Sequence, residues 1–460
     1  MNKQCDVLII GGGPAGTTIG SFLVQKGRQV TLLEKDHHPR FHIGESLLPM
    51  NLPILERLGV LEQVEKIGVI KHGAEFNSMM DTSRRSTIYF KKAMDKTHPF
   101  AYQIKRSEFD EILFRNCQRL GVNALEGVRV TDVEISGDNA HLVHTQNEAG
   151  ETCTWETKFV VDASGRDTFL SKRFGFKEKN PSHNSAAIFG HFSGVTRREG
   201  EDQGNISIYW FEHGWFWMIP LRDEVTSVGA VCFPDYLKTR RNTPKDFLWD
   251  TINLSPGVQE RMKNARLISE VQATGNYTYT SRRMHGERYM LLGDAFAFID
   301  PIFSSGVYFA MSSAEMGAKV VDSCLRKPAA APSLLRAHER QVRKGISLFS
   351  WFIYRFNTPA MHHLFMNKQN HFRIEEAMTS LLAGDIFRGT PIKRPIALFK
   401  ILYYGVVTAL LAKSWASYKR RMKNAAMIFT GGTTEVDASD INPDVAQKTT
   451  VPVSKEKLPT

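Results

Sequence analysis

The chain has 460 residues, of which 42% are apolar and 23% charged, a composition typical of folded rather than disordered proteins. It carries 59 lysines and arginines against 48 acidic residues, a net charge of +11. Residues 336–430 hold 16 basic and four acidic residues, so the excess lies in that segment and the first 335 residues are almost neutral. Charge confined to one segment argues against a nucleic-acid-binding protein. The five cysteines form no C-x-x-C pair, so we expect neither a disulfide scaffold nor a metal site.

The first residues run directly into glycines and lack the pattern of a secretory signal. Residues 395–413 are apolar but are interrupted by Lys400, and a spanning helix needs about 20 predominantly apolar residues. We therefore interpret this segment as a buried or surface-lying helix, and we expect a cytoplasmic protein.

Apolar runs and turn residues predict the elements in chain order. Residues 7–10 and 29–34 are expected to be strands flanking a helix at residues 17–26. Helices then follow around residues 53–58 and 107–120, with strands at 87–90, 128–135 and 154–161. Residues 183–275 are expected to be mainly β, with a hairpin formed by 205–210 and 215–221. A short strand at residues 289–292 precedes a mostly helical stretch at 308–430, and residues 431–460 are expected to be a disordered tail.

Glycines at the first predicted turn point to a dinucleotide site. Gly11, Gly13 and Gly16 fill the pattern G-x-G-x-x-G between a strand and a helix, where free N–H groups favour phosphate. Glu34 follows 18 residues after Gly16, at the end of the second strand, where an acid can accept the ribose hydroxyls. These residues predict FAD or NAD without choosing between them.

Two later segments favour FAD. Residues 160–166, V-V-D-A-S-G-R, and 291–295, L-L-G-D-A, resemble motifs of the FAD-dependent monooxygenase superfamily. That resemblance implies that Asp294 binds the ribityl chain and that Arg106 contacts the flavin. No second G-x-G-x-x-G appears, which favours reduced flavin supplied by a separate reductase. We predict as cofactor-binding residues Gly11, Gly13, Ala15, Gly16, Glu34, Lys35, Arg40, Ser46, Arg106, Gly293, Asp294 and Gly306.

The segment from Trp215 to Pro220 matches W-x-W-x-I-P, the signature of flavin-dependent halogenases. On a strand, Trp215 and Trp217 share one face. The resemblance implies that the two indoles form a wall beside the flavin, which keeps the organic substrate away from it. The alternative is an ordinary aromatic hairpin in a β core.

The same resemblance assigns two further sites. Lys71 falls where halogenases place an essential lysine, which orients hypohalous acid or forms a chloramine, and burial would lower its pKa enough for either role. Ser305 and Gly306 fall in the loop whose N–H groups hold chloride or bromide. The alternatives are a solvated surface lysine and a helix capped by Ser304 or Ser305.

The chain departs from the tryptophan halogenases at Phe303, where those enzymes carry a glutamate that stabilises the cationic intermediate. We therefore expect a substrate that activates itself, a phenol or a pyrrole, free or tethered to an acyl or peptidyl carrier protein. The basic segment could dock such an acidic carrier. A helix pair with a cationic outer face and contact with anionic lipid are the alternatives, and peripheral membrane contact is the less favoured of these.

The predicted fold is α/β: a Rossmann-type FAD-binding domain of the glutathione-reductase and hydroxybenzoate-hydroxylase type. We expect a halogenase body over residues 1–330, with β-rich substrate regions at about 70–105 and 183–275, and a basic helical module at 331–430. The rival functions are a monooxygenase, a geranylgeranyl-reductase-like enzyme and a flavin-binding protein that has lost its activity.

Overall fold

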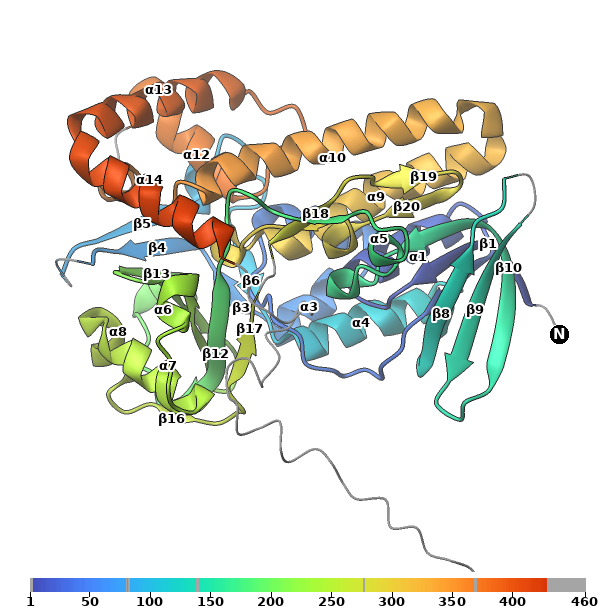
Figure 1. Ribbon diagram of the computed structural model, residues 1–460, viewed down its shortest axis with the longest axis horizontal. Coiled ribbons are helices and arrows are strands. Elements are labelled where there is room, and N and C mark those ends of the chain that lie inside the picture. Colours follow the sequence, from blue (N-terminus) through green and yellow to red (C-terminus); the bar gives the residue numbers. More distant parts are fainter. Residues whose placement is uncertain are drawn as a thin grey trace, which may run out of the picture.

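The structure is a computed structural model that describes residues 3–79, 81, 83–137, 140–275, 278–367 and 370–427. The predicted tail at 431–460 lies outside these residues. The chain forms two large sheets covered by helices (Figure 1).

The first sheet carries the predicted βαβ unit. β1 (Lys3–Ile10) is paired in parallel with β2 (Val30–Leu33) on one side and β10 (Thr152–Asp162) on the other. All four residues of β2 and the last four of β1 are buried, as expected for strands covered on both faces. The strand order is β19-β20-β10-β1-β2-β7, with β8 and β9 added through β10. The remaining strands are β7 (Asn123–Leu125), β8 (Val128–Glu134), β9 (His141–Asn147), β19 (His285–Gly286) and β20 (Tyr289–Leu291).

Helices pack on this sheet through apolar side chains. α1 (Pro14–Val24) follows the glycine turn and packs against α4 and the long helix α9. Ile19 of α1 and Phe109 of α4 are fully buried in the same core cluster. The helices around this sheet are α2 (Leu52–Leu58), α3 (Leu61–Ile67), α4 (Arg106–Arg119), α5 (Phe169–Arg173) and α9 (Ser305–Arg326).

The second sheet has the order β16-β12-β15-β14-β13-β4-β5, with β17 also paired to β12. The predicted hairpin is present, with Trp210 opposite Trp215 in the register. Its strands are β4 (Gly73–Asn77), β5 (Arg85–Tyr89), β12 (Ala186–Ser193), β13 (Ile206–Phe211), β14 (Gly214–Pro220), β15 (Thr226–Cys232), β16 (Arg266–Leu267) and β17 (Gln272–Thr274).

The prediction of mainly β structure over residues 183–275 is wrong for its middle part. Three helices lie there: α6 (Pro234–Leu237), α7 (Pro244–Asn253) and α8 (Pro256–Met262). Each begins at a proline, which favours the first helical turn, and the Thr243 side chain caps α7. They cover one face of the second sheet (Figure 1).

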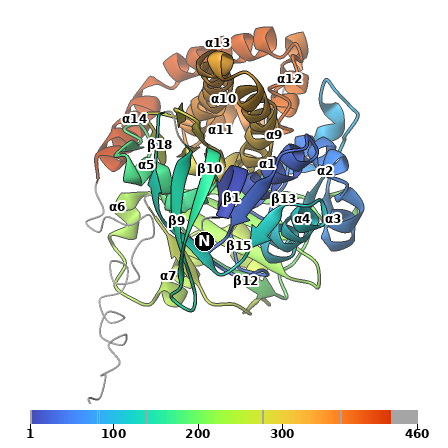
Figure 2. The same ribbon diagram turned by 90° about the vertical axis from the view of Figure 1, so that its right-hand side faces the viewer.

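The other face of the second sheet packs against the C-terminal helices. Phe352, Phe356 and Phe365 join Trp210 and Trp215 in one core cluster. Both views place α13 and α14 at the outer edge of the molecule (Figures 1 and 2). These helices are α10 (Ala331–Ile353), α11 (Pro359–Met366), α12 (Ile374–Leu382), α13 (Lys393–Ala409) and α14 (Leu411–Ala426).

The described residues also form two small sheets. β3 (Val69–Lys71) is paired with β6 (Ala101–Gln103), and β18 (Tyr279–Ser281) lies between β11 (Lys177–Lys179) and β21 (Ala297–Phe298). Among the described residues, no single helix is long and apolar enough to cross a membrane. The pair α13 and α14, bent by 105°, meets that test only when the two are taken together. The proposed boundaries at residues 330 and 430 remain predictions.

Candidate active site

The glycine turn after β1 leaves room for a phosphate group. Gly11 has φ +104°, and a β-carbon on it would lie 2.5 Å from the carbonyl oxygen of Ala163. A β-carbon on Gly16 would lie 2.0 Å from the Gly11 oxygen, so the helix meets the strand closely. Gly13, by contrast, has only Arg40 nearby, at 4.0 Å. No side chain caps the start of α1, whose N–H groups are therefore available to an anion.

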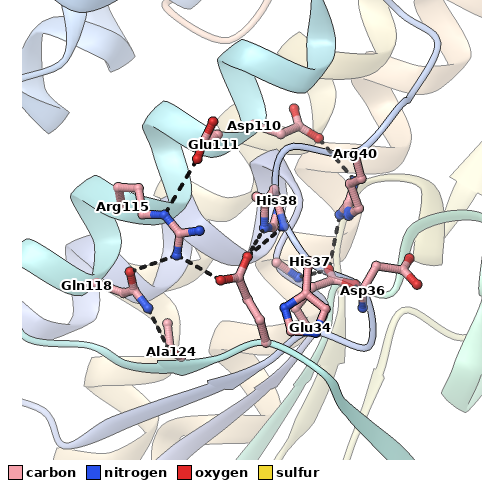
Figure 3. A network of polar contacts seen from close by, with 12 residues as sticks. Glu34, Asp36, His37, His38, Arg40, Asp110, Glu111, Arg115, Gln118 and Ala124 are labelled. Carbon is pink, nitrogen blue, oxygen red and sulfur yellow. Dashed lines mark hydrogen bonds and ion pairs between the residues drawn. The ribbon is translucent and has the colours of Figure 1, made fainter. Parts of the chain in front are cut away.

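The acid at the end of β2 is held beside this turn. Glu34 Oε2 accepts hydrogen bonds from the Gly12 amide at 2.7 Å and from Arg40 at 3.0 Å. Figure 3 shows Arg40 extending between Glu34 and Asp110. Burial would raise the pKa of Glu34, but Arg40 and the backbone amides outweigh it and lower that pKa, so the carboxylate stays charged. Lys35 lies farther out, half-exposed and paired with Asp167 at 2.6 Å.

Two further predicted cofactor-binding residues, Arg106 and Asp294, come from the start of α4 and from the turn after β20. Arg106 is buried and makes a two-pronged ion pair with Asp110, at 2.8 and 2.9 Å, and donates to the Ile43 oxygen. Burial raises the pKa of Asp294 to about 6, with Arg166 and Arg106 opposing the rise. The structure records no side-chain hydrogen bond to the Asp294 carboxyl from any described residue.

Asp294 lines a cavity that is partly open to solvent. A β-carbon on Gly293 would lie 3.6 Å from the side chain of Ala15, so the second FAD motif touches the helix that follows the glycine turn. Ser305 and Gly306 of the halide loop line the same cavity. An open phosphate cradle, a charged acid for ribose and the Asp294 carboxyl beside a cavity together fit FAD.

Lys71 is buried in the body of the protein, with 1% of its surface exposed. It ends β3, and its amine donates hydrogen bonds to Ser46 Oγ at 2.9 Å and to the Leu47 oxygen at 3.1 Å. The amine also lies 5.3 Å from the ring centre of Phe90. Burial lowers the pKa of Lys71 from 10.5 to about 7, because the interior solvates the ammonium poorly. Lys71 is therefore a titratable amine near neutral pH.

The two tryptophans of the motif form a buried wall on β14. Their ring centres are 5.9 Å apart with planes tilted by 51°. Trp217 donates its indole N–H to Ser227 Oγ at 3.2 Å and packs on Phe189. Gly229, directly opposite Trp217 on β15, makes room for the indole, because a β-carbon there would lie 2.2 Å from it.

The halide loop leads into helix α9, whose first turn is capped by no side chain. Asp300 accepts a hydrogen bond from the Ile302 amide, and Ser304 has φ +54°. No side-chain hydrogen bond caps α9, so the alternative of a serine cap is wrong. The first amides of α9, at Ser305 and Gly306, are thus free to bind an anion at the cavity.

Contacts connect these parts. Phe356 lies 5.8 Å from Phe303 of the halide loop and 6.3 Å from Trp215, measured between ring centres. Ser46 accepts the hydrogen bond from Lys71, and the preceding Glu45 is ion-paired with His191 at 2.8 Å. The halide loop and the tryptophan wall therefore share Phe356 as a neighbour, and the lysine segment is joined to the second sheet through Glu45 and His191.

Comparisons with known proteins show the family of this chain. The family described as FAD binding domain matches residues 4–344. A 1H-pyrrole-2-carbonyl-[peptidyl-carrier protein] chlorinase of Pseudomonas fluorescens is 30% identical over 409 residues, 84% of this chain and 90% of the relative. The chain belongs to the flavin-dependent halogenases.

Two more halogenases are similar. The tryptophan 2-halogenase of Chondromyces crocatus is 35% identical over 328 residues, 69% of this chain but only 61% of the relative. The solved structure of the myxobacterial chondrochloren halogenase CndH superposes with a TM-score of 0.74 at 31% identity, and the match covers 88% of this chain and 97% of that one. This halogenase is thus an FAD enzyme of mixed α/β fold, as the motifs predicted.

Sequence reasoning missed three residues of the site. Asp110 holds Arg106, His191 holds Glu45, and Gly229 accommodates Trp217. The spacing of Arg106 and Asp110, four residues apart on one helix, was a readable signal. His191 and Gly229 gave none, because His191 meets Glu45 across the fold and Gly229 meets Trp217 only through the register of β14 and β15.

Proposed function

We propose that this halogenase acts on a pyrrole or phenol carried by an acyl or peptidyl carrier protein. Phe303 is the observation that carries the substrate class. It is buried against Phe349 and Phe356, so position 303 of the halide loop offers no carboxylate to a cationic ring intermediate. A ring that donates electrons from its own nitrogen or hydroxyl needs no such carboxylate.

FAD would be held by the glycine turn, with Glu34 on its ribose and Asp294 on its ribityl chain. Reduced FAD, supplied by a separate reductase, provides with dioxygen the oxidising power that converts chloride or bromide to hypohalous acid. The amides of Ser305 and Gly306 hold the halide. Trp215 and Trp217 exclude the organic ring from the flavin.

Lys71 would present the halogen to the ring. Its amine is buried and donates to two hydrogen-bond acceptors, which fix its direction. With a pKa of about 7, it exists as both ammonium and amine at neutral pH, so it can hydrogen-bond hypohalous acid or take up its halogen. The carrier requirement rests on the chlorinase relative, which acts on a carrier-bound pyrrole.

The test is an assay with FAD, a flavin reductase, NADH and bromide. Free pyrrole-2-carboxylate and simple phenols are compared with the same acyl groups on a carrier protein, and products are followed by mass spectrometry. We expect a bromine mass shift on the carrier-bound pyrrole or phenol that disappears in Lys71→Ala. Lys245→Ala, at an exposed helix position, is the matched control. Hydroxylated product without bromine would refute halogenation, and equal turnover of free acid would refute the carrier requirement.

A further inference from the structure

Helix α14 exposes its apolar side and turns its polar side to the protein, unlike a helix that packs on a protein core. Leu411, Trp415, Tyr418 and Met422 follow the spacing i, i+4, i+7, i+11 and so form one stripe along the helix. All four are exposed, with Leu411 at 66% and Trp415 at 56%. Four large apolar side chains in a row thus face outward.

The face of α14 that points to the protein is polar instead. Arg420 is ion-paired with Asp235 at 3.1 Å and donates to the Glu212 oxygen. Arg421 donates to the Tyr354 oxygen, and the buried Asn424 accepts from the Asp235 amide. The helix is therefore fixed to the body by polar contacts, and its apolar stripe is left without a partner in the described structure.

Helix α13 extends this surface beyond the bend. Ile401 is 67% exposed, and Leu402 and Tyr404 are 45% and 49% exposed. The inner side of α13 is apolar in the usual way, with Phe399 and Tyr403 buried against the helical core. Figures 1 and 2 show both helices on the outer edge of the molecule.

Every charged residue of α13 and α14 is positive. The sequence has no acidic residue from Ile386 to Thr434. Lys419 lies over the Trp415 ring at 5.3 Å, and Lys423 follows one turn later, so both lie beside the stripe rather than in it. Trp415 and Tyr418 stack at 5.6 Å, which presents a flat aromatic pair between the aliphatic ends of the stripe.

We propose that the outer face of α13 and α14 rests on the surface of an anionic phospholipid bilayer. A helix lying at the level of the headgroups has apolar and aromatic side chains at its centre and lysines along its border, and this is the arrangement of α14. An acidic carrier protein would be met best by cations at the centre of the face, where this chain has Leu411 and Trp415. The proposal concerns attachment and is independent of the substrate proposed above.

The test is co-sedimentation of the FAD-loaded full chain with vesicles. Vesicles of phosphatidylcholine with phosphatidylglycerol are compared with vesicles of phosphatidylcholine alone. We expect binding to the anionic vesicles that weakens in high salt, because lysines next to anionic headgroups contribute through screened attraction. The double variant Leu411→Ser and Trp415→Ser should lose at least about tenfold in binding.

Matched controls separate this face from exposed apolar surface in general. Leu254→Ser with Ile268→Ser removes two side chains of similar exposure, 50% and 53%, far from α14 in the chain, and should leave vesicle binding unchanged. Lys419→Gln with Lys423→Gln should reduce binding to anionic vesicles only. Flavin absorbance and the circular dichroism spectrum confirm that each variant is folded.

Three results would overturn the proposal. The first is that the wild-type chain stays in solution with anionic vesicles. The second is that the α14 variants and the control variants bind vesicles equally well. The third is that sedimentation velocity finds a dimer or a carrier complex that dissociates in the α14 variants, while the wild-type chain binds no vesicles. The stripe would then be a protein interface.

Discussion

Replacing Lys71 by methionine tests the buried amine through the stability of the protein. In the wild-type chain, folding lowers the pKa of Lys71 from 10.5 to about 7. Between these two pH values the unfolded chain binds more protons than the folded one, so the free energy of unfolding rises with pH across this window. Below about pH 7 the wild-type protein carries the full cost of burying the charge, and above pH 10.5 it carries none.

The magnitude follows from the pKa values. Lowering a pKa from 10.5 to about 7 corresponds to about 5 kcal/mol. Lys71→Met removes that cost but also loses the hydrogen bonds to Ser46 and Leu47, about 1 kcal/mol each. The variant should therefore be more stable than wild type by about 3 kcal/mol near pH 6, and the difference should vanish near about pH 9.

Urea unfolding of both proteins from pH 6 to pH 9 measures this difference. Lys245→Met, which removes an exposed lysine, should give a difference that does not change with pH. If the Lys71→Met difference is equally flat, Lys71 is not a buried amine with a lowered pKa, and the reasoning fails. In the same variant, halogenated product should fall by at least about 100-fold while flavin oxidation continues.

Three further substitutions test the rest of the site. Gly229→Ala places a β-carbon 2.2 Å from Trp217 and should lower the free energy of unfolding in urea by about 1–3 kcal/mol. Because the indole wall is displaced, mass spectrometry should also detect oxygenated substrate. Unchanged products would contradict the role of the wall. Gly11 has φ +104°, and the β-carbon of Gly11→Ala would lie 2.5 Å from the Ala163 oxygen, so this variant should purify without flavin absorbance. The control Gly405→Ala, in helix α13, should keep its flavin and gain up to about 1 kcal/mol in the free energy of unfolding. Because burial raises the pKa of Asp294 to about 6, the contribution of this carboxyl to the stability of the apoprotein should fall as pH rises from 3.8 to about 6. Asp294→Asn removes that contribution, so the difference in unfolding free energy between wild type and variant should change across this window, and FAD binding should weaken in a fluorescence titration. A difference that does not change with pH would contradict the raised pKa of Asp294.

Local patterns were sufficient to predict the elements that carry the flavin. The strand at residues 7–10 and the helix after it are present as β1 and α1, because an apolar run, a glycine turn and a helix start are all read within one short window. Helices α6 to α8 were missed because they are short, interrupt a β-rich region and are held by the sheet they cover. Such elements depend on tertiary packing more than on their own periodicity.

The site was predictable where a residue belongs to a motif and not where it depends on pairing across the fold. Lys71 was selected by its motif context, and its role remains a prediction, while the structure adds that its amine is buried. One alternative for the basic segment was a cationic outer face, but Arg420 and Arg421 point inward to Asp235 and Tyr354. A one-dimensional charge count does not reveal which side of a helix a charge occupies.

The flavin cradle is assembled from opposite ends of a long stretch of chain. β1 is paired with β10, which is in turn paired with β20, and the loop after β20 supplies Gly293 and Asp294. A ribosome-bound chain that ends before Gly293 holds the glycine turn and the ribose acid but lacks the opposing wall. The complete cradle therefore requires the chain up to Asp294, so flavin capture would come late in synthesis.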